Sequence, residues 1–217
     1  MKYILKESPP PEFERWKKSF EAASGQPPTY SDFKGQVKKR FKQSLLIEQG
    51  YICCYCMARI HDYDSHIEHF VPRAESRRDP HSVIAQDVQL NYKNLFLSCE
   101  GEYDDGQWDG KHCGQAKKDE GSAMLISPSD SESSSVFEYD MQGNIRGITA
   151  PAMTTVRVLN LQDPALIRHR RTAIFRSGIL DGDEDLDELV EMYQSKDEDG
   201  AYAPFCESIL YVLKKLA

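Results

Sequence analysis

The chain has 217 residues, 40% of them hydrophobic and 29% charged, and its formal net charge is −8. No segment approaches the roughly 18 consecutive apolar residues of a membrane span, and the N-terminus lacks the apolar core of a secretory signal. We therefore expect a cytoplasmic globular protein with no membrane association, large enough for one well-cored domain or for a core domain with a smaller helical one.

Two helices are predicted before residue 50. Residues 10–24 follow a proline-rich lead, and residues 31–48 form an amphipathic pattern with Ser31 as the expected N-cap. Gly50 is expected to end the second helix. Within that helix, residues 34–42 carry five positive charges and no acid. Such a segment can bind phosphate groups, although a solvated helix face is the simpler interpretation.

The second half of the chain is predicted to be mostly helical. Residues 135–149 predict two short strands around a Gly-Asn turn, and helices are expected at about 150–160, 164–180, 185–195 and 203–216. Residues 168–176 carry four arginines and a histidine, whereas 181–200 carry ten acids and one lysine. These two segments are either docking surfaces or solvated helix faces. Charge reversal at Arg168, Arg170 and Arg171 distinguishes the two interpretations.

Six cysteines in a cytoplasmic chain of this length favour thiols, a metal site or catalysis over disulfides. Cys53 and Cys56 form a C-x-x-C pair, and a tight turn of that kind points two thiolates at one centre, which is half of a tetrahedral zinc site. Cys99 and Cys113 can supply the other half if the acidic, glycine-containing segment between them loops out. The alternatives are a redox pair at the first two cysteines or six thiols without a metal.

The remaining cysteines and most histidines have simpler interpretations. Cys54 is expected to be a small buried hydrophobe, and Cys206 to pack in the core from the last helix. Ordinary surface or core roles are expected for His61, His66, His81 and His169. Of these, His66 lies close enough in sequence to a further motif to support it.

That motif follows the first cysteine pair. Glu68 and His69 are adjacent in "HIEHFVP", and Pro72 ends this extended run. Asn94 then precedes "LFLSC", which predicts a short apolar strand, and "GQAKKD" after the last cysteine of the region can start a helix.

The order of these residues resembles that of the HNH nucleases, the zinc-stabilised branch of the ββα-metal group. In that family a C-x-x-C knuckle precedes an acid-His pair and a proline, and then come an Asn-Leu motif and a second knuckle with a His or Asn and a Lys. The matching residues are Cys53, Cys56, Glu68, His69, Pro72, Asn94, Leu95, Cys99, His112, Cys113 and Lys117. More narrowly, "ICCYCMARI", "IEHFVPR", "LNYKNLFLSCEG", "HCGQAKKD" and "LNLQDPALIRHRR" resemble the PtuB-type HNH proteins of Septu and retron-associated antiphage systems.

The resemblance implies an α+β, mainly helical fold. A small zinc-bound ββα-metal (HNH) core at 51–125 would be flanked by an N-terminal helical segment at 1–50 and by a β-hairpin with C-terminal helices at 126–217. It implies a structural zinc ion on Cys53, Cys56, Cys99 and Cys113.

The same resemblance assigns catalytic roles. His69 would be the general base, and Glu68 with His112 would hold one divalent ion, Mg²⁺ or Mn²⁺. Asn94 would orient His69 by hydrogen bonding and fix the loop. Contacts to nucleic-acid phosphates would come from Lys117 and Lys118.

The chain departs from the family pattern at the second knuckle. Thirteen residues separate Cys99 from Cys113, and Gly114 stands where many HNH proteins place Asn or His. The final histidine of the motif is therefore assigned to His112, with Gln115 or Asp119 as alternatives.

The implied function is a metal-dependent HNH endonuclease, the effector of a bacterial antiphage complex with a Septu-type (PtuA-like) ATPase and a retron reverse transcriptase with its msDNA. DNA is favoured as the substrate, with RNA such as tRNA as the alternative. Two other classes stay open: a non-catalytic zinc-binding adaptor, which would not need the Glu, His and Asn residues, and a thiol redox protein, which would not need zinc.

Overall fold

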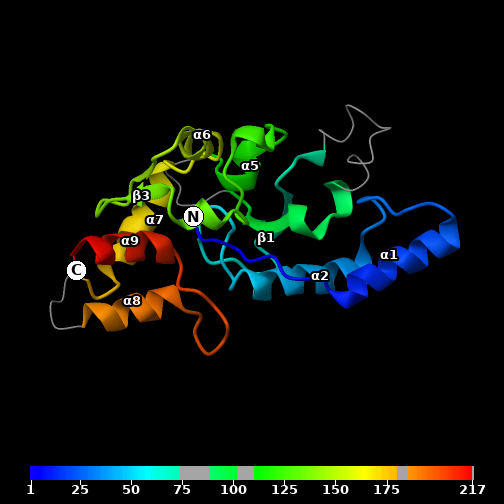
Figure 1. Cartoon of the computed structure of the whole chain (residues 1–217), viewed down its shortest axis with the longest axis horizontal. Helices are drawn as coiled ribbons and strands as arrows, with labels where there is room; N and C mark the ends of the chain where they lie inside the picture. The colour runs from blue at the N-terminus through cyan, green and yellow to red at the C-terminus, as the bar shows by residue number, and fades with distance from the viewer. Residues whose placement is uncertain (74–87, 102–109, 180–184, 217) are drawn as a thin grey trace.

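The computed structural model describes residues 1–73, 88–101, 110–179 and 185–216 (Figure 1). Over these residues the chain is a mixture of helices and small sheets, and each of the two sheets contains two antiparallel strands. Within the same residues, no helix combines the length and the apolar content needed to cross a membrane.

The two predicted N-terminal helices are present. α1 (Pro11–Ser24) begins with a proline, whose missing N–H is not needed in a first turn. α2 (Gly35–Glu48) begins later than predicted and has no side-chain cap. Ser31 lies in a turn instead, where Asp32 accepts hydrogen bonds from Thr29. The predicted N-cap at Ser31 is therefore wrong.

Two strands and a short helix occupy the middle of the chain. β1 (Ser65–His69) pairs antiparallel with β2 (Leu95–Cys99), and Ile67 lies opposite Leu97. A 3-10 turn, η1 (Tyr92–Asn94), leads into β2, and α5 (Cys113–Lys117) packs against β2. The predicted apolar strand and the predicted helix after the last knuckle cysteine are both confirmed.

The C-terminal elements also follow the prediction. After two 3-10 turns, η2 (Ser122–Met124) and η3 (Ser131–Ser134), the hairpin pairs β3 (Phe137–Tyr139) with β4 (Ile145–Gly147). Gly143 in the turn has a φ of 87°, a conformation that favours glycine. The helices that follow are α6 (Ala150–Val158), α7 (Pro164–Phe175), α8 (Leu186–Gln194) and α9 (Cys206–Leu216).

One hydrophobic core includes residues from all three predicted segments, among them Phe41, Leu97 and Leu166. A smaller cluster around Leu189 and Leu213 joins α7, α8 and α9. Figure 1 shows β1 near the middle of the molecule, with α1 at one end and α8 and α9 at the other. β1 and α5 therefore lie between the N-terminal helices and the C-terminal ones (Figure 1). The domain boundaries at 50 and 125 stay a prediction.

Candidate metal centre and active site

Four of the six cysteines converge. The Sγ atoms of Cys53, Cys56, Cys99 and Cys113 all lie within 4.8 Å of one another. Among the residues that the structure describes, this is the only group of three or more His, Cys, Asp or Glu side chains close enough to share a metal ion. The structure thus brings together the four ligands predicted from the sequence.

The four sulfurs come from three separate parts of the chain. In the first turn the Met57 N–H donates to the Cys53 carbonyl, and Met57 takes a left-handed φ of 66°. Cys99 is the last residue of β2, and Cys113 is the first of α5. The Cys99 N–H lies 3.4 Å from the Cys53 Sγ. An N–H directed at a sulfur favours the thiolate, the form that binds metals.

The donor set fits zinc. Four thiolates about 2.3 Å from a tetrahedral zinc ion are about 3.8 Å apart, and the Sγ atoms of Cys56 and Cys99 are 3.8 Å apart. Burial raises the pKa of Cys53, but hydrogen bonds from neighbouring thiols, Cys113 first, hold this pKa well below its ordinary value. Hydrogen bonds to Cys53 and burial raise the pKa values of Cys99 and Cys113. The spacing of the four sulfurs shows that they could hold a metal such as zinc.

Cys54 and Cys206 lie outside this group, as predicted. Both are buried in the hydrophobic core. Burial raises the pKa of Cys54 well above its ordinary value, and it raises the pKa of Cys206 to about 11. Both are therefore neutral thiols that pack as small apolar groups.

His112 lies at the cysteine cluster. Its Nδ1 is 3.2 Å from the Cys113 Sγ and 3.8 Å from the Cys99 Sγ, and the residue is buried. These distances suit an imidazole N–H that donates to a thiolate. The His112 Nδ1 therefore faces the sulfurs, and the divalent site predicted on His112 and Glu68 stays a prediction.

Glu68 has a different set of partners. Its Oε1 accepts a hydrogen bond of 3.1 Å from the Tyr55 hydroxyl and lies 3.0 Å from the Lys117 Nζ. Its Oε2 lies 3.7 Å from the His66 Nε2. Burial raises the pKa of Glu68, but His66 and the Lys117 ammonium outweigh burial and lower this pKa. Glu68 is therefore ionised at neutral pH. Gln115 and Asp119, the alternatives to His112 as the final residue of the motif, are not among the described contacts of Glu68.

Lys117 differs from its predicted role. Its side chain is buried, and its Nζ donates to the His69 carbonyl at 3.0 Å as well as pairing with Glu68. An ammonium held in this way does not reach a phosphate at the surface. Lys118 is exposed and remains available for the predicted contact.

His69 is the last residue of β1 and is largely buried. Its Nε2 lies 3.0 Å from the carbonyl of Gln89. A carbonyl only accepts hydrogen bonds, so Nε2 carries the proton in the neutral ring and Nδ1 has the free lone pair. Burial lowers the pKa of His69 to about 4. The imidazole is therefore neutral at pH 7 and is able to accept a proton at Nδ1.

Asn94 fixes the two ends of the segment that joins β1 to β2. Its Oδ1 accepts from the Val71 N–H at 2.7 Å, and its Nδ2 donates to the carbonyls of Val71 and Val88, both at 3.0 Å. The predicted role in fixing the loop agrees with these bonds. The described bonds of Asn94 do not include one to His69. The Val88 carbonyl that Asn94 binds precedes Gln89, whose carbonyl contacts the His69 Nε2.

Three residues near His69 were not identified as site residues from the sequence. The Tyr30 ring packs edge-on against the His69 ring, with centroids 4.7 Å apart. Lys38 Nζ lies 4.7 Å from the Tyr30 centroid, and Arg73 Cζ lies 4.6 Å from it. The basic run at 34–42 was a signal for Lys38, but nothing in the sequence placed that run beside the Glu-His pair.

The predicted basic surface on α7 has one member that is not at the surface. Arg170 is buried, its Nε donates to the Gly143 carbonyl at 2.6 Å, and its Nη2 donates to the Leu161 carbonyl at 2.7 Å. Arg168 and Arg171 are exposed. Charge reversal at Arg170 therefore tests folding, and only the two exposed arginines can test docking.

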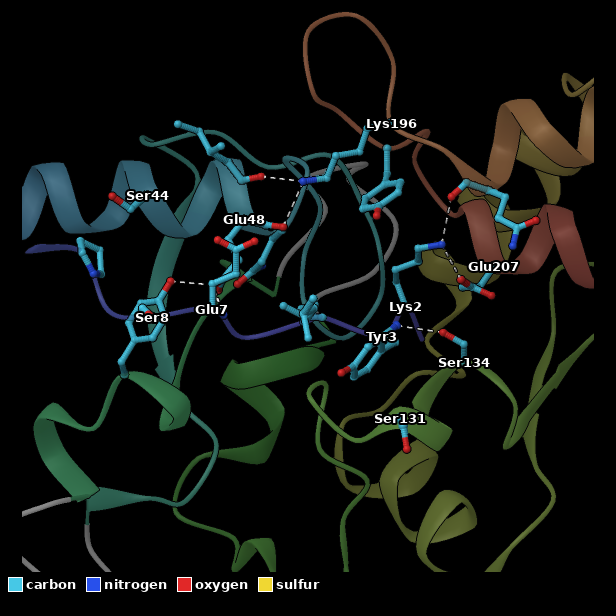
Figure 2. A pocket seen from close by; sticks show the side chains of 18 of the residues that line it. Lys2, Tyr3, Glu7, Ser8, Ser44, Glu48, Ser131, Ser134, Lys196 and Glu207 are labelled. Carbon is cyan, nitrogen blue, oxygen red and sulfur yellow. Dashed lines mark hydrogen bonds and ion pairs between the residues drawn. The ribbon is translucent and has the colours of Figure 1, made fainter.

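A groove of about 930 Å³ lies elsewhere, along the N-terminal residues, the end of α2 and the start of α9. Figure 2 shows that its polar groups engage one another. Lys196 Nζ donates to the Glu48 carbonyl, and Lys2 pairs with Glu207. None of the predicted catalytic or metal-binding residues lines this groove, so the groove adds nothing to the candidate site.

Comparison with known proteins adds no assignment, because no family model and no curated protein matches the chain.

Proposed function

We propose that the chain is a metal-dependent endonuclease of the HNH type that hydrolyses phosphodiester bonds in nucleic acid. The observation that carries the proposal is the state of His69, whose Nε2 is engaged by the Gln89 carbonyl while Nδ1 keeps its lone pair. Next to it in the chain is Glu68, a carboxylate that is ionised at neutral pH. The order β1, β2, α5 and the four-cysteine cluster are consistent with the zinc-stabilised ββα arrangement of that family.

In the proposed reaction, His69 Nδ1 accepts one proton from a water molecule. The water oxygen forms a bond to phosphorus as the bond from phosphorus to the leaving nucleoside oxygen breaks. That oxygen then takes a proton from solvent and becomes a hydroxyl group. A divalent ion held by Glu68 would supply positive charge to the phosphate and to the leaving oxygen.

Positive charge beside His69 supports a polyanionic substrate. Lys38 and Arg73 both lie on the ring of Tyr30, which itself contacts His69. Burial lowers the pKa of Lys38, and the charge of Arg73 lowers it further. Two cations that repel each other are stabilised by an anion placed between them. We therefore assign the phosphate contacts first predicted for Lys117 to Lys38 and Arg73, together with Lys118.

The resemblance of the motifs extends the proposal to a biological setting. On that basis the nuclease acts in a bacterial antiphage complex with a Septu-type ATPase and a retron reverse transcriptase with its msDNA. The chemistry at phosphorus does not select the sugar, so DNA, which the resemblance favours, and RNA both belong in the test.

The test is a cleavage assay on the purified chain, alone and with the proteins encoded beside it. Plasmid DNA and tRNA are incubated with Mn²⁺ or Mg²⁺, and His69→Ala is compared with the parent. His61→Ala is a matched control, because that exposed histidine pairs only with nearby Asp64 among its described ion pairs. Loss of a positioned base lowers the rate by about 100-fold or more. Equal cleavage by the His69 variant rules out the assigned role.

A non-catalytic zinc adaptor is the second candidate, and one observation favours it. The Glu68 carboxylate already has an ammonium partner in Lys117, so it is compensated in the absence of a divalent ion. The adaptor predicts zinc binding and complex formation without cleavage. Persistent absence of cleavage of DNA and RNA in the full complex supports it over the nuclease.

A further inference from the structure

His66 and Glu68 direct two donor atoms into one small space beside α5. Residues two apart on a strand face the same side, and here the side chains of β1 at these positions meet the backbone of Gly114. A Cβ built on Gly114 would lie 2.8 Å from the Glu68 Oε2 and 2.8 Å from the His66 Nε2. The absence of a side chain at residue 114 therefore keeps open the space on which the two donors converge.

The two donor atoms are close enough to bind one ion. His66 Nε2 and Glu68 Oε2 lie 3.7 Å apart. Bonds of about 2.1 Å from each donor to a metal reach about 4.2 Å when added together, so both can be made without moving either side chain far. Lys117 and Tyr55 engage the other carboxylate oxygen, Oε1, and leave Oε2 for this interaction.

The second nitrogen of His66 faces another carboxylate. Its Nδ1 is buried, makes no hydrogen bond within the described residues, and lies 3.5 Å from the Glu100 Oε2. A histidine that binds a metal through one nitrogen commonly donates the N–H of the other to a carboxylate, which fixes the ring and its tautomer. In this chain Glu100 would be the carboxylate behind the His66 ring, and His66 Nε2 would face the metal together with Glu68.

We propose that His66 and Glu68 together bind the divalent ion of this protein and that Glu100 positions the His66 ring. The proposal rests on the nuclease function proposed above, and it assigns to His66 the part that the sequence assigned to His112. It also specifies the metal class. Mg²⁺ prefers oxygen donors, whereas an imidazole suits divalent transition metals. The site therefore prefers Mn²⁺ to Mg²⁺.

The test measures Mn²⁺ binding to the full chain by electron paramagnetic resonance, with zinc content measured on the same samples. We expect His66→Ala to weaken Mn²⁺ binding by about tenfold or more, with unchanged zinc and with the preference over Mg²⁺ lost. Glu100→Gln keeps the shape of the side chain and is expected to weaken Mn²⁺ binding less than His66→Ala does. His61→Ala is the matched control and binds Mn²⁺ as the parent does.

A second variant approaches the same space from α5. Gly114→Ala places a methyl group between the two donors and is expected to weaken Mn²⁺ binding with zinc retained, so the test does not depend on the folding of one variant. Parental Mn²⁺ affinity in both His66→Ala and Gly114→Ala overturns the proposal.

Failure of the His66 metal site and failure of the nuclease function give different results. If Mn²⁺ binds through His66 and no nucleic acid is cut, the metal site stands and the nuclease assignment falls. If the parent and His66→Ala cut equally well with equal Mn²⁺ affinity, the nuclease stands and this site falls.

Discussion

Cys53 and Cys54 are neighbours in the chain but have different surroundings, and this difference gives a sharp test of the metal centre. The Sγ of Cys53 belongs to the group of four sulfurs, whereas Cys54 is buried in the core outside it. We predict that Cys53→Ala removes zinc and most of the stability of the fold. Cys54→Ala, the matched control, removes a buried sulfur of the same size and keeps the metal.

The expected magnitudes differ widely. A structural zinc site contributes about 10–16 kcal/mol in small zinc-dependent domains, which is comparable to the whole unfolding free energy of a typical domain, about 5–15 kcal/mol. Loss of one of four ligands therefore removes a large part of the net stability. Cys54→Ala loses the burial of one small apolar group, which is worth about 1 kcal/mol.

Zinc per chain by mass spectrometry and thermal unfolding by circular dichroism are the two measurements. The parent and Cys54→Ala are expected to hold about one zinc ion per chain, and their Tm values should differ by about 2–4 °C. Cys53→Ala should lack zinc and unfold more than about 10 °C lower, or fail to fold. Equal zinc and equal Tm in the two variants would refute the four-sulfur site, and a parent without zinc would favour the thiol alternatives.

Three further predictions concern polar residues whose contacts the structure defines. Arg170→Met lowers the free energy of unfolding in urea by about 3–5 kcal/mol because it leaves two buried carbonyls without donors, whereas Arg171→Ala on the same helix changes it by less than about 0.5 kcal/mol. Lys117→Met lowers the free energy of unfolding by about 3–5 kcal/mol because the buried Glu68 carboxylate loses its ammonium partner. Lys118→Met, at the exposed neighbouring residue, is the control. Asn94→Ala removes three hydrogen bonds, so amide hydrogen exchange at Phe70, Val71 and Arg73 becomes faster and cleavage slower.

Each of these predictions has an outcome that contradicts it. Similar urea midpoints for the two arginine variants would place Arg170 at the surface. Stability losses of the same size in the two lysine variants would contradict the burial of Lys117. Unchanged exchange in Asn94→Ala would show that other contacts hold the ends of the loop.

The helices and the cysteine cluster could be predicted from the sequence because their signals are local. An apolar stripe with period 3.6 and a turn at Gly143 identify elements without knowledge of their neighbours. The C-x-x-C pair likewise requires a turn that aims two sulfurs at one point. A second pair was then needed, and the sequence offered Cys99 and Cys113, with the Cys54 side chain expected to point away.

The contacts of single polar residues could not be predicted, because they depend on which distant segments pack together. Lys117 meets Glu68 only because α5 lies against the sheet, and Arg170 reaches two carbonyls of other segments. His112 was assigned by its place in a motif, but its ring turns toward the sulfurs. His66 was identified only as a neighbour of the motif, since the sequence does not show that residue 114 leaves space beside it.

Rescue of His69→Ala by imidazole is the most direct test of the central claim, that His69 is the base for phosphodiester hydrolysis. The rate of nucleic-acid cleavage by the variant is measured with and without added imidazole, in the complex and with the metal that support cleavage by the parent. We predict that the variant is slower than the parent by about 100-fold or more and that imidazole restores part of the lost rate while the parent does not respond. Parental cleavage by His69→Ala without imidazole would contradict the account.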